Sequence, residues 1–473
     1  MKKKDKKKKK KIMLALILLF IIPIIYSLNT KNPKGTNISG EFKKTQADFI
    51  YDLTYTKDQK RIHEININKE EMEIIKNAKK FLLIDFFLYN DEYDKKLSAY
   101  PSQVEQMTNL LIEKKKENPH MPILFVTDPI NNFYGAYEQK YLKKLKENGI
   151  ELVITDLNKM RDSNPIISGP YRAYIKYLGT GGKTYINNFF KKDGPKINIR
   201  AILKLLNFKA NHRKILVSEN KALVASANPH DPSAFHSNVA CIFTGKAIED
   251  LIKSESIFFD KMPDTIKNYK AVDIKNSNEE LRMISEGEIF NALYKNINET
   301  KAKDQIKIGI FYLSEFRILK ALGQASDRGV DVKIIADLNK DAFGIKKNGC
   351  PNRPALSELK KGHPKINIKW YKTTGEQFHT KIAYFSYKDK EPRLILGSAN
   401  FTRRNLDNFN LETDVEIKMN KNSALISKFE NYYDRIWNNI GGEYTQNFES
   451  GLDKNIFLKF IWKVQEKTGT CTW

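Results

Sequence analysis

The chain has 473 residues, of which 41% are hydrophobic and 29% charged, a composition that excludes disordered and collagen-like proteins and suits two or three folded domains. Three cysteines are too few for a disulfide framework or for a zinc site made of thiolates alone, so we expect neither a metal nor another cofactor. Residues 1–11 hold nine lysines and one aspartate and carry +8 of the net charge of +25, which leaves about +17 on the rest of the chain and favours an anionic partner.

The first element in chain order is an uncharged apolar run over residues 12–28. Its length is near the short end of the transmembrane range and slightly above that of most signal-peptide cores. No small-residue cleavage pattern follows it, which favours a retained anchor over a removed signal. The other reading is a core helix beside a lysine tail that binds nucleic acid, but the run has no polar face. Lysines before a first membrane helix stay in the cytoplasm, so we expect a single-pass protein with a cytoplasmic tail (1–11) and its body outside the cytoplasm.

The segment after the anchor, residues 29–47, is polar, contains Pro33, Gly35 and Gly40 and has no apolar period, so we predict a linker. Beyond it, apolar runs alternate with helical patterns to about residue 440, which is typical of α/β domains with buried strands. Three features recur there in the same order. They are FLLIDFFL (81–88) and IKIGIFYL (306–313), PILFVTDPIN (122–131) and DVKIIADLN (331–339), and the two His-x-Lys strands at His212 and His379.

This repeat predicts two copies of one α/β unit. The boundaries that we expect are a first lobe over 48–261, a connection over 262–280, a second lobe over 281–440 and a C-terminal tail over 441–473. The tail is apolar and then polar and too short to span a bilayer, so it either caps the second lobe or lies on the membrane.

The first copy is longer than the second, and most of the extra length lies in an insertion at about residues 166–210. This insertion interleaves aromatic and cationic residues: Tyr171, Tyr174, Tyr177, Tyr185, Phe189 and Phe190 with Arg172, Lys176, Lys183, Lys191, Lys192 and Arg200. Such a mixture suits a lipid headgroup interface and equally suits single-stranded nucleic acid, where bases stack on rings. A surface excursion that packs on its own lobe is the third interpretation.

Two of the seven histidines head strands of matching pattern, in NHRKILVSENKALVASAN (211–228) and FHTKIAYFSYKDKEPRLILGSANFTRRN (378–405). In an alternating strand, His and Lys two positions apart point to the same face, so a ring nitrogen and an ammonium can address one anion. Each strand is followed by an apolar run that ends in Ser-Ala-Asn. The repeat then predicts one cleft with two imidazoles, two ammoniums and two amides, which is a phosphate site that needs no metal. The other five histidines have no such context and receive no role.

The doubled motif resembles that of the phospholipase D superfamily, His-x-Lys-x4-Asp followed by Gly-Ser-x-Asn, over roughly residues 50–440. The resemblance implies two tandem α/β/α sandwich lobes related by a pseudo-twofold axis, here with one N-terminal membrane helix added. It also implies a phosphohistidine intermediate, with His212 as nucleophile and His379 as general acid and base. Phosphate oxygens would then be held by Lys214, Lys381, Asn228 and Asn400, with Ser226 and Ser398 in supporting positions.

The sequence departs from the family pattern at the motif aspartate, which is replaced by Glu219 in the first copy and by Ser386 in the second. Glu219 keeps the negative charge and Ser386 does not, which puts packing in doubt more than chemistry. Downstream of the second motif, Asn410-Leu411-Glu412 matches a further family feature. A carboxylate at Glu412 can accept a hydrogen bond from the Nδ1 of one histidine and leave Nε2 free to react. The first copy has Asn238-Val239-Ala240 and lacks this acid.

Three functions follow from these features. The first is a membrane-anchored phosphodiesterase or phosphatidyltransferase of phospholipase D type, which acts on phospholipids and takes a phospholipid membrane as its partner. The second is a nuclease of the same superfamily, supported by the basic body. The third is a degenerate protein that binds anionic surfaces without turnover. No protein partner is predicted.

Overall fold

A computed structural model describes residues 2–93, 99–189, 191, 194–342 and 345–470. The strands of the first lobe are β2 (Ala47–Lys57), β3 (Lys60–Glu64), β4 (Leu82–Phe86), β5 (Ile123–Thr127), β6 (Glu151–Ile154), β7 (Lys214–Ser218), β8 (Ala222–Ala225) and β9 (Asn238–Phe243). The second sheet contains β1 (Lys43–Thr45), β10 (Glu279–Ser285), β11 (Gln305–Ile310), β12 (Asp331–Ala336), β15 (Asn367–Tyr371), β16 (Lys381–Ser386), β17 (Arg393–Gly397), β18 (Thr413–Met419) and β19 (Thr445–Asn447). A small hairpin, β13 (Asp341–Ala342) and β14 (Ile345–Lys346), stands apart from both.

The two sheets have the same strand order. The first runs β3-β2-β9-β8-β7-β4-β5-β6 and the second β1-β10-β18-β17-β16-β11-β12-β15-β19, so their seven central strands correspond one to one. In each, the first strand of the repeat is parallel to the next one and antiparallel to the His-x-Lys strand: β4 pairs with β5 and β7, and β11 with β12 and β16. The predicted two-lobed α/β fold is therefore confirmed.

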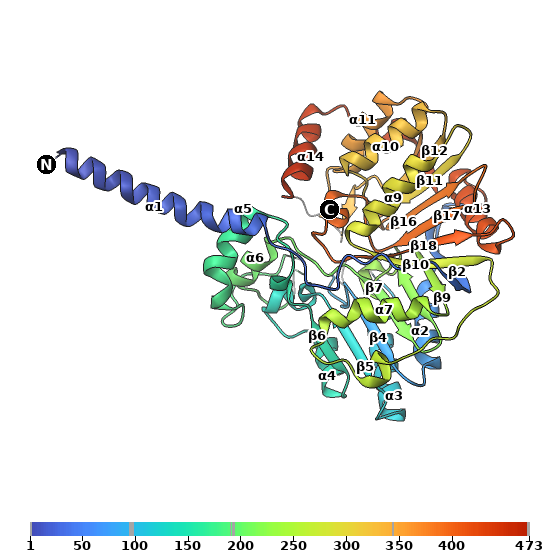
Figure 1. Ribbon diagram of the computed structural model, residues 1–473, viewed down its shortest axis with the longest axis horizontal. Coiled ribbons are helices and arrows are strands. Elements are labelled where there is room, and N and C mark those ends of the chain that lie inside the picture. The colour runs from blue at the N-terminus through green and yellow to red at the C-terminus, as the bar shows by residue number, and fades with distance from the viewer. Residues whose placement is uncertain (1, 94–98, 190, 192–193, 343–344, 471–473) are drawn as a thin grey trace.

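Helices cover both sheets (Figure 1). Those of the first lobe and its insertion are α2 (Ile67–Asn77), α3 (Gln103–Glu117), α4 (Lys140–Glu147), α5 (Pro165–Pro170), α6 (Ile199–Leu205), α7 (Ala247–Glu255) and α8 (Asp264–Lys267). Those of the second lobe are α9 (Gly287–Glu299), α10 (Phe316–Asp327), α11 (Asn352–Gly362), α12 (Arg403–Leu406), α13 (Ala424–Trp437) and α14 (Ile456–Thr468). Because the central strands are covered on both faces, they read as continuous apolar runs rather than alternating ones.

Three hydrophobic clusters account for this layering. One packs α2, α3 and α4 on the outer face of the first sheet, and a second packs α9, α10 and α11 on the outer face of the other. The third lies between the sheets and draws on both lobes, joining Val217 of β7 to Leu396 of β17 and to Phe429 of α13. The lobes thus share one core, which fixes the faces that meet at their junction.

Two of the predicted segments, the linker and the tail, contact the second lobe. The segment predicted as a linker (29–47) is not free along its length, because β1 adds to the edge of the second sheet through antiparallel pairing with β10. The tail (441–473) also belongs to the second lobe, where β19 pairs with β15 and Trp462 of α14 is buried in the lobe's core. Backbone hydrogen bonding at a sheet edge can order a short polar strand that has no apolar signal.

The apolar N-terminal run lies in one long helix, α1 (Lys2–Leu28), which projects away from the body in Figure 1. Residues Asp5–Leu28 are long and apolar enough to cross a membrane, and only 11% of the most apolar stretch is buried in the protein. The insertion lies beside the end of this helix. There Tyr174 donates a hydrogen bond to the carbonyl of Leu19 over 2.6 Å, and Gly169 of α5 abuts Pro23. Phe190 and Lys192 of the insertion lie outside the described residues.

Candidate active site

His212 stands just before β7, and its backbone N–H donates to the carbonyl of Leu411 in the other lobe over 2.8 Å. Its Nδ1 lies 2.9 Å from Oε2 of Glu412, a fully buried carboxylate. The same oxygen accepts a hydrogen bond from the Ser398 hydroxyl at 2.5 Å, and the other oxygen accepts one from Asn405. Because Nδ1 donates its proton to a carboxylate, the lone pair of the neutral imidazole lies on Nε2.

His379 stands just before β16 in an arrangement of the same design. Its Nδ1 lies 3.1 Å from Oδ1 of Asn238, which also accepts a hydrogen bond from the Ser226 hydroxyl at 2.9 Å. An aromatic ring packs on each histidine, Phe87 on His212 and Phe311 on His379, with ring centroids 4.8 and 5.0 Å apart. The two sites differ in one respect: the Nδ1 acceptor is charged for His212 and neutral for His379.

In both sites the Nδ1 acceptor comes from the opposite lobe. Glu412 precedes β18 and serves the histidine of the first lobe, whereas Asn238 opens β9 and serves that of the second. Two isolated parallel bridges, Asn211 with Leu411 and Ser237 with Phe378, join the lobes directly beside the histidines. Neither histidine is therefore fully oriented by its own lobe, and the two motifs form one composite site.

The ammonium group of each motif lysine lies at the backbone carbonyl of the histidine two positions before it. Lys214 Nζ donates to the carbonyl of His212 at 2.5 Å, and Lys381 Nζ to that of His379 at 2.7 Å. Burial lowers the pKa of Lys214 to about 7, against the opposing effect of Glu412. Burial and the neighbouring charge of Lys214 lower the pKa of Lys381 well below its ordinary value. An anion bound in the groove would restore both ammonium charges, because an opposite charge favours the protonated form.

The histidines titrate low for the same reason. The pKa of His212 is lowered to about 4, chiefly by burial and then by Lys214, although Glu412 works to raise it. The pKa of His379 is also well below 6.5, because of burial, Lys381 and the neighbouring ring of His236. The pKa of Glu412 is lowered: burial would raise it, but His212 and Lys214 outweigh that effect. The empty site thus holds a carboxylate and neutral imidazoles, which suits an imidazole that attacks as a nucleophile.

The two asparagines of the Ser-Ala-Asn segments lie three residues beyond the ends of β8 and β17, and both are buried. Oδ1 of Asn228 accepts the backbone N–H of Leu88 over 3.2 Å, which leaves its NH2 group for a ligand. Asn400 is buried, and its Oδ1 has no partner among the described residues. Of the residues that the sequence analysis assigned to phosphate chemistry, the two histidines contact the opposite lobe, and the two lysines lie near enough to each other for Lys214 to lower the pKa of Lys381.

Three orienting residues were missed. Asp128 and Asp337 occupy equivalent positions after β5 and β12, and each carboxylate accepts the backbone N–H of the residue before a motif histidine, Asn211 at 2.8 Å and Phe378 at 2.7 Å. The recurrence of an Asp at the end of both matched strands was the available signal. The third is His236, whose ring lies 5.9 Å from that of His379 and whose Nδ1 accepts the N–H of Gln377.

At the ends of β7 and β16 away from the histidines, other carboxylates accept backbone hydrogen bonds in both lobes. Glu219, in the turn after β7, accepts backbone N–H groups of Lys79 and Lys80 just before β4. In the second lobe the acid stands on the other side of the same contact, where Asp304 precedes β11 and accepts the N–H of Lys388 in the hairpin turn over 2.9 Å. The change from Asp to Ser386 therefore leaves the packing of this hairpin intact.

Comparisons with known proteins bear on this arrangement. The family model described as "Cardiolipin synthase, PLD-like domain" matches residues 293–437, which is most of the second lobe. A search of the curated proteins finds no match in sequence.

Among solved structures, phosphatidylserine synthase of Haemophilus influenzae is similar over 90% of this chain and 94% of its own, at 12% identity and a TM-score of 0.58. Polyphosphate kinase of Porphyromonas gingivalis is similar over 81% and 49%, at 12% identity and a TM-score of 0.43, and the phospholipase D family member Nuc of Salmonella typhimurium over 35% and 97%, at 23% and 0.27. The similarity to the first of these is a similarity of fold. The second lobe thus matches a phospholipase D-like family model, and the first lobe repeats its strand order and its His-x-Lys motif.

Proposed function

We propose that the protein is a membrane-anchored phosphodiesterase or phosphatidyltransferase of phospholipase D type that acts on phospholipids through a phosphohistidine. One observation carries the proposal: both histidines of a doubled His-x-Lys motif stand at the lobe junction, each held through Nδ1 by the opposite lobe. That geometry leaves two Nε2 atoms for one phosphodiester, one to attack phosphorus and one to handle the leaving oxygen.

In the first step, the bound phosphodiester anion favours the protonated form of His379. Nε2 of His212 attacks phosphorus, the bond from phosphorus to the headgroup oxygen breaks, and the leaving alkoxide takes the Nε2 proton of His379. The phosphoryl-bearing ring of His212 is cationic, and the Glu412 carboxylate at Nδ1 stabilises that charge. A neutral amide at Nδ1 of His379 gives no such support, so its protonated form is a strong acid and suits the leaving alkoxide. The different partners of the two rings thus support His212 as nucleophile and His379 as acid.

In the second step, His379 takes a proton from water or from an acceptor alcohol, whose oxygen attacks phosphorus and releases Nε2 of His212. Lys214 and Lys381, with the amides of Asn228 and Asn400, hold the non-bridging oxygens through both steps. The lysines supply positive charge and the asparagines supply neutral N–H donors. A bound phosphate would raise the depressed pKa values of both lysines.

The membrane anchor is part of the proposal. The apolar helix α1 is long enough to span a bilayer, and the lysines at its start place that end in the cytoplasm by the positive-inside rule. The body and its groove then face the outer side, next to the lipid substrate.

The test is to trap the intermediate. Full-length protein is incubated in vesicles of phosphatidylglycerol or phosphatidylethanolamine labelled at phosphorus. The reaction is stopped with mild acid, and the digested protein is searched for phosphatidyl-histidine by mass spectrometry. His379→Asn should stall turnover and accumulate the adduct on His212, whereas His212→Asn should give neither adduct nor turnover. Adduct on His379 alone would reverse the two roles, and turnover that persists in both variants would refute the mechanism.

A second candidate is a nuclease that uses the same histidines, and the observation in its favour is the charge of about +17 outside the tail. The discriminating assay compares headgroup release from vesicles with shortening of labelled single-stranded DNA by the same preparation. Tyr174→Ser with Tyr177→Ser serves as the probe of the insertion, because both rings are about half exposed or more. Loss of vesicle turnover alone supports the lipid substrate, and loss of DNA cleavage alone supports the nuclease. Absence of any adduct or turnover would leave the non-catalytic interpretation.

A further inference from the structure

A cavity lies where the apolar helix α1 joins the body, and none of its lining residues belongs to the candidate active site. Its volume is about 310 Å³, and it is lined by Tyr26, Asn29, Thr30 and Lys31 at the end of α1, by Asn158, Lys159 and Met160 after β6, and by Arg172 of the insertion. That volume is at the lower end of the range of small-molecule sites, roughly 300–1,000 Å³. Three of the eight lining side chains are cationic and none is acidic, so the cavity favours an anion.

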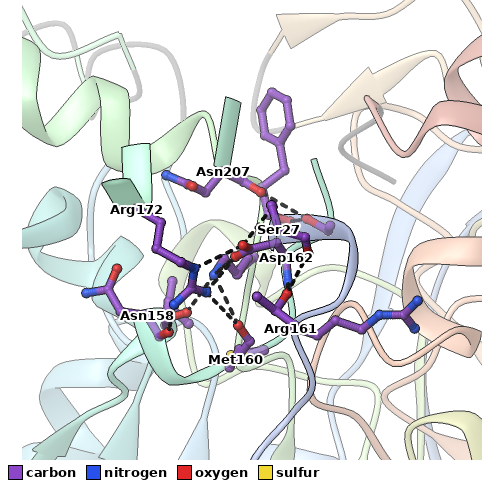
Figure 2. A network of polar contacts seen from close by, with 12 residues as sticks. Ser27, Asn158, Met160, Arg161, Asp162, Arg172 and Asn207 are labelled. Atoms are coloured by element: carbon purple, nitrogen blue, oxygen red, sulfur yellow. Dashed lines mark hydrogen bonds and ion pairs between the residues drawn. The ribbon is translucent and has the colours of Figure 1, made fainter. Parts of the chain in front are cut away.

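The walls of this cavity are held by a polar network around Asp162, which Figure 2 shows from close by. Asp162 accepts hydrogen bonds from Ser27 of α1 at 2.7 Å, from Lys209 at 2.5 Å and from Arg172 at 2.7 and 3.0 Å. Arg172 also donates to the backbone carbonyls of Asn158 and Met160, at 2.8 and 3.3 Å. The guanidinium on the cavity wall is therefore fixed in place before any ligand arrives.

The end of the membrane helix is tied into the same network. The hydroxyl of Thr30 accepts the backbone N–H of Asp162 over 2.8 Å, and the side chain of Asn32 accepts that of Arg161 over 2.8 Å. Asn32 also donates to the carbonyl of Asn408 in the second lobe. The chain that leaves α1 thus contacts both lobes within a few residues, and the cavity is a permanent part of the molecule.

The charges around the cavity leave a surplus of positive charge. The carboxylate of Asp162 is nearly buried and is already paired with Arg172 and Lys209; burial would raise its pKa, but these partners lower it overall. Lys31 and Lys159 are exposed, and neither makes an ion pair with a described residue. Asp156 is the other acid close by, where it caps the turn at Asn158. Two unpaired ammoniums beside a fixed guanidinium form a receptor for phosphate.

The cavity stands at a defined depth if α1 spans a bilayer, as proposed above. The apolar run ends at residue 28, so Tyr26 lies in the last turn of the membrane segment and Lys31 just beyond it. Tyr26 is 63% exposed, and tyrosines prefer the headgroup level of a bilayer. Tyr174 and Leu178 of the insertion are also exposed on the same side of the junction, where Tyr174 is bonded to α1. Lipid headgroups therefore surround the mouth of the cavity.

We infer that this cavity is a binding site for the phosphate of an anionic phospholipid, separate from the catalytic groove. The lipid phosphate lies between Lys31, Lys159 and Arg172, and its acyl chains run along α1 and the exposed rings of the insertion. A lipid held there fixes the angle between the membrane helix and the body, because one wall of the cavity belongs to α1 and the other to the body. The inference rests on the proposed membrane anchor but not on the proposed reaction.

The test uses full-length protein reconstituted in nanodiscs that contain photoreactive phosphatidylglycerol among phosphatidylcholine. Irradiation, digestion and mass spectrometry locate the cross-links, and native mass spectrometry counts the lipids retained in detergent. The probe variant is Lys31→Gln with Lys159→Gln. The matched control is Lys57→Gln with Lys116→Gln, which removes the same charge from exposed positions at the end of β2 and in α3. We expect the probe variant to lose preference for phosphatidylglycerol over phosphatidylcholine by about tenfold or more, and the control to keep it.

Cross-links on peptides 26–31 or 158–172 that vanish in the probe variant would support the site. Equal retention of both lipids by the wild type, or unchanged preference in the probe variant, would overturn it. Inorganic phosphate at millimolar concentration distinguishes the source of the phosphate: a site for free phosphate would release the lipid, and that outcome would also overturn the inference. Flotation of the wild type with vesicles is measured in parallel, so a failure of the anchor itself is recognised separately from a failure of the lipid site.

Discussion

The exchange of orienting groups between lobes makes Glu412→Gln the most informative substitution. Both oxygens of Glu412 are acceptors, one for His212 Nδ1 and Ser398 and the other for Asn405. A glutamine can keep only one of these oxygens, so its NH2 group meets a donor, and the negative charge is lost in either orientation. We expect the variant to keep the fold, because β18 is held by backbone pairing with β10 and β17 from Thr413 onward.

The expected loss follows from the geometry. In the proposed reaction His212 becomes cationic when it is phosphorylated, and an oxygen of the Glu412 carboxylate lies 2.9 Å from its Nδ1. Two unit charges centred about 4 Å apart attract by about 4 kcal/mol at an effective dielectric constant of about 20. A loss of about 3–4 kcal/mol from the transition state lowers kcat by about 10²- to 10³-fold. KM should stay constant or fall, because removing a negative charge favours an anionic substrate.

The assay is steady-state headgroup release by full-length protein in mixed vesicles, with kcat and KM determined separately. Glu416→Gln is the control: Glu416 stands on β18, four residues after Glu412, and is buried in an ion pair with Arg282, and its hydrogen bonds and ion pairs are with residues other than the two histidines. This control should lose stability but keep kcat within about threefold. If Glu412→Gln keeps kcat within the same limit, or if the control falls as far, the carboxylate does not stabilise a cationic His212 and the assignment of the nucleophile fails.

Three further predictions concern charge. Asn238→Asp places a carboxylate beside His379 and raises its pKa, so the activity that needs protonated His379 should persist to higher pH, with the alkaline limb of kcat displaced by about one unit or more in a pH series. Lys214→Met should abolish turnover yet raise the free energy of unfolding by about 1–4 kcal/mol. The pKa of Lys214 falls from 10.5 to about 7 in the fold. Denaturant titration should therefore show the full gain in stability below pH 7 and a smaller gain as the pH rises toward 10. Arg213→Met leaves Glu255 and Glu286 buried and unpaired, so unfolding should cost about 3–5 kcal/mol less, and Arg213→Lys should recover only part of this because an ammonium cannot bridge two carboxylates as a guanidinium does.

The predictable part of the site was the part that repeats. His212 and His379, with the lysines two positions on, recur with Ser-Ala-Asn segments in both copies, and the buried strands that carry them read as apolar runs. Their meeting at the lobe junction follows from the shared strand order of the two sheets. Of the groups that orient the rings, only Glu412 was predicted, because it matches a family pattern rather than a spacing.

The remaining contacts join segments that nothing in the sequence relates. Asp304 supplies to the hairpin of the second lobe what Glu219 supplies to the first, but from a position 84 residues earlier in the chain than its partner Lys388. β1 has no apolar residue, and its order comes from backbone pairing with β10 and from the contact of Lys43 with Asp250. Periodicity detects burial, so contacts made by backbone and charge are invisible to it.

The orienting groups are crossed between the lobes, so the surroundings of each histidine depend on the opposite lobe. A carboxylate at position 412 acts on the ring of the first lobe, and an amide at 238 acts on the ring of the second. A substitution at either position therefore changes the pKa of the histidine in the opposite lobe and leaves the sheet that carries that histidine unchanged. Two copies of one unit can in this way acquire a nucleophile and an acid from identical motifs, because the difference between Glu and Asn stabilises positive charge on one ring only. In the proposed reaction, two residues outside both His-x-Lys motifs then determine which histidine attacks and which acts as the acid.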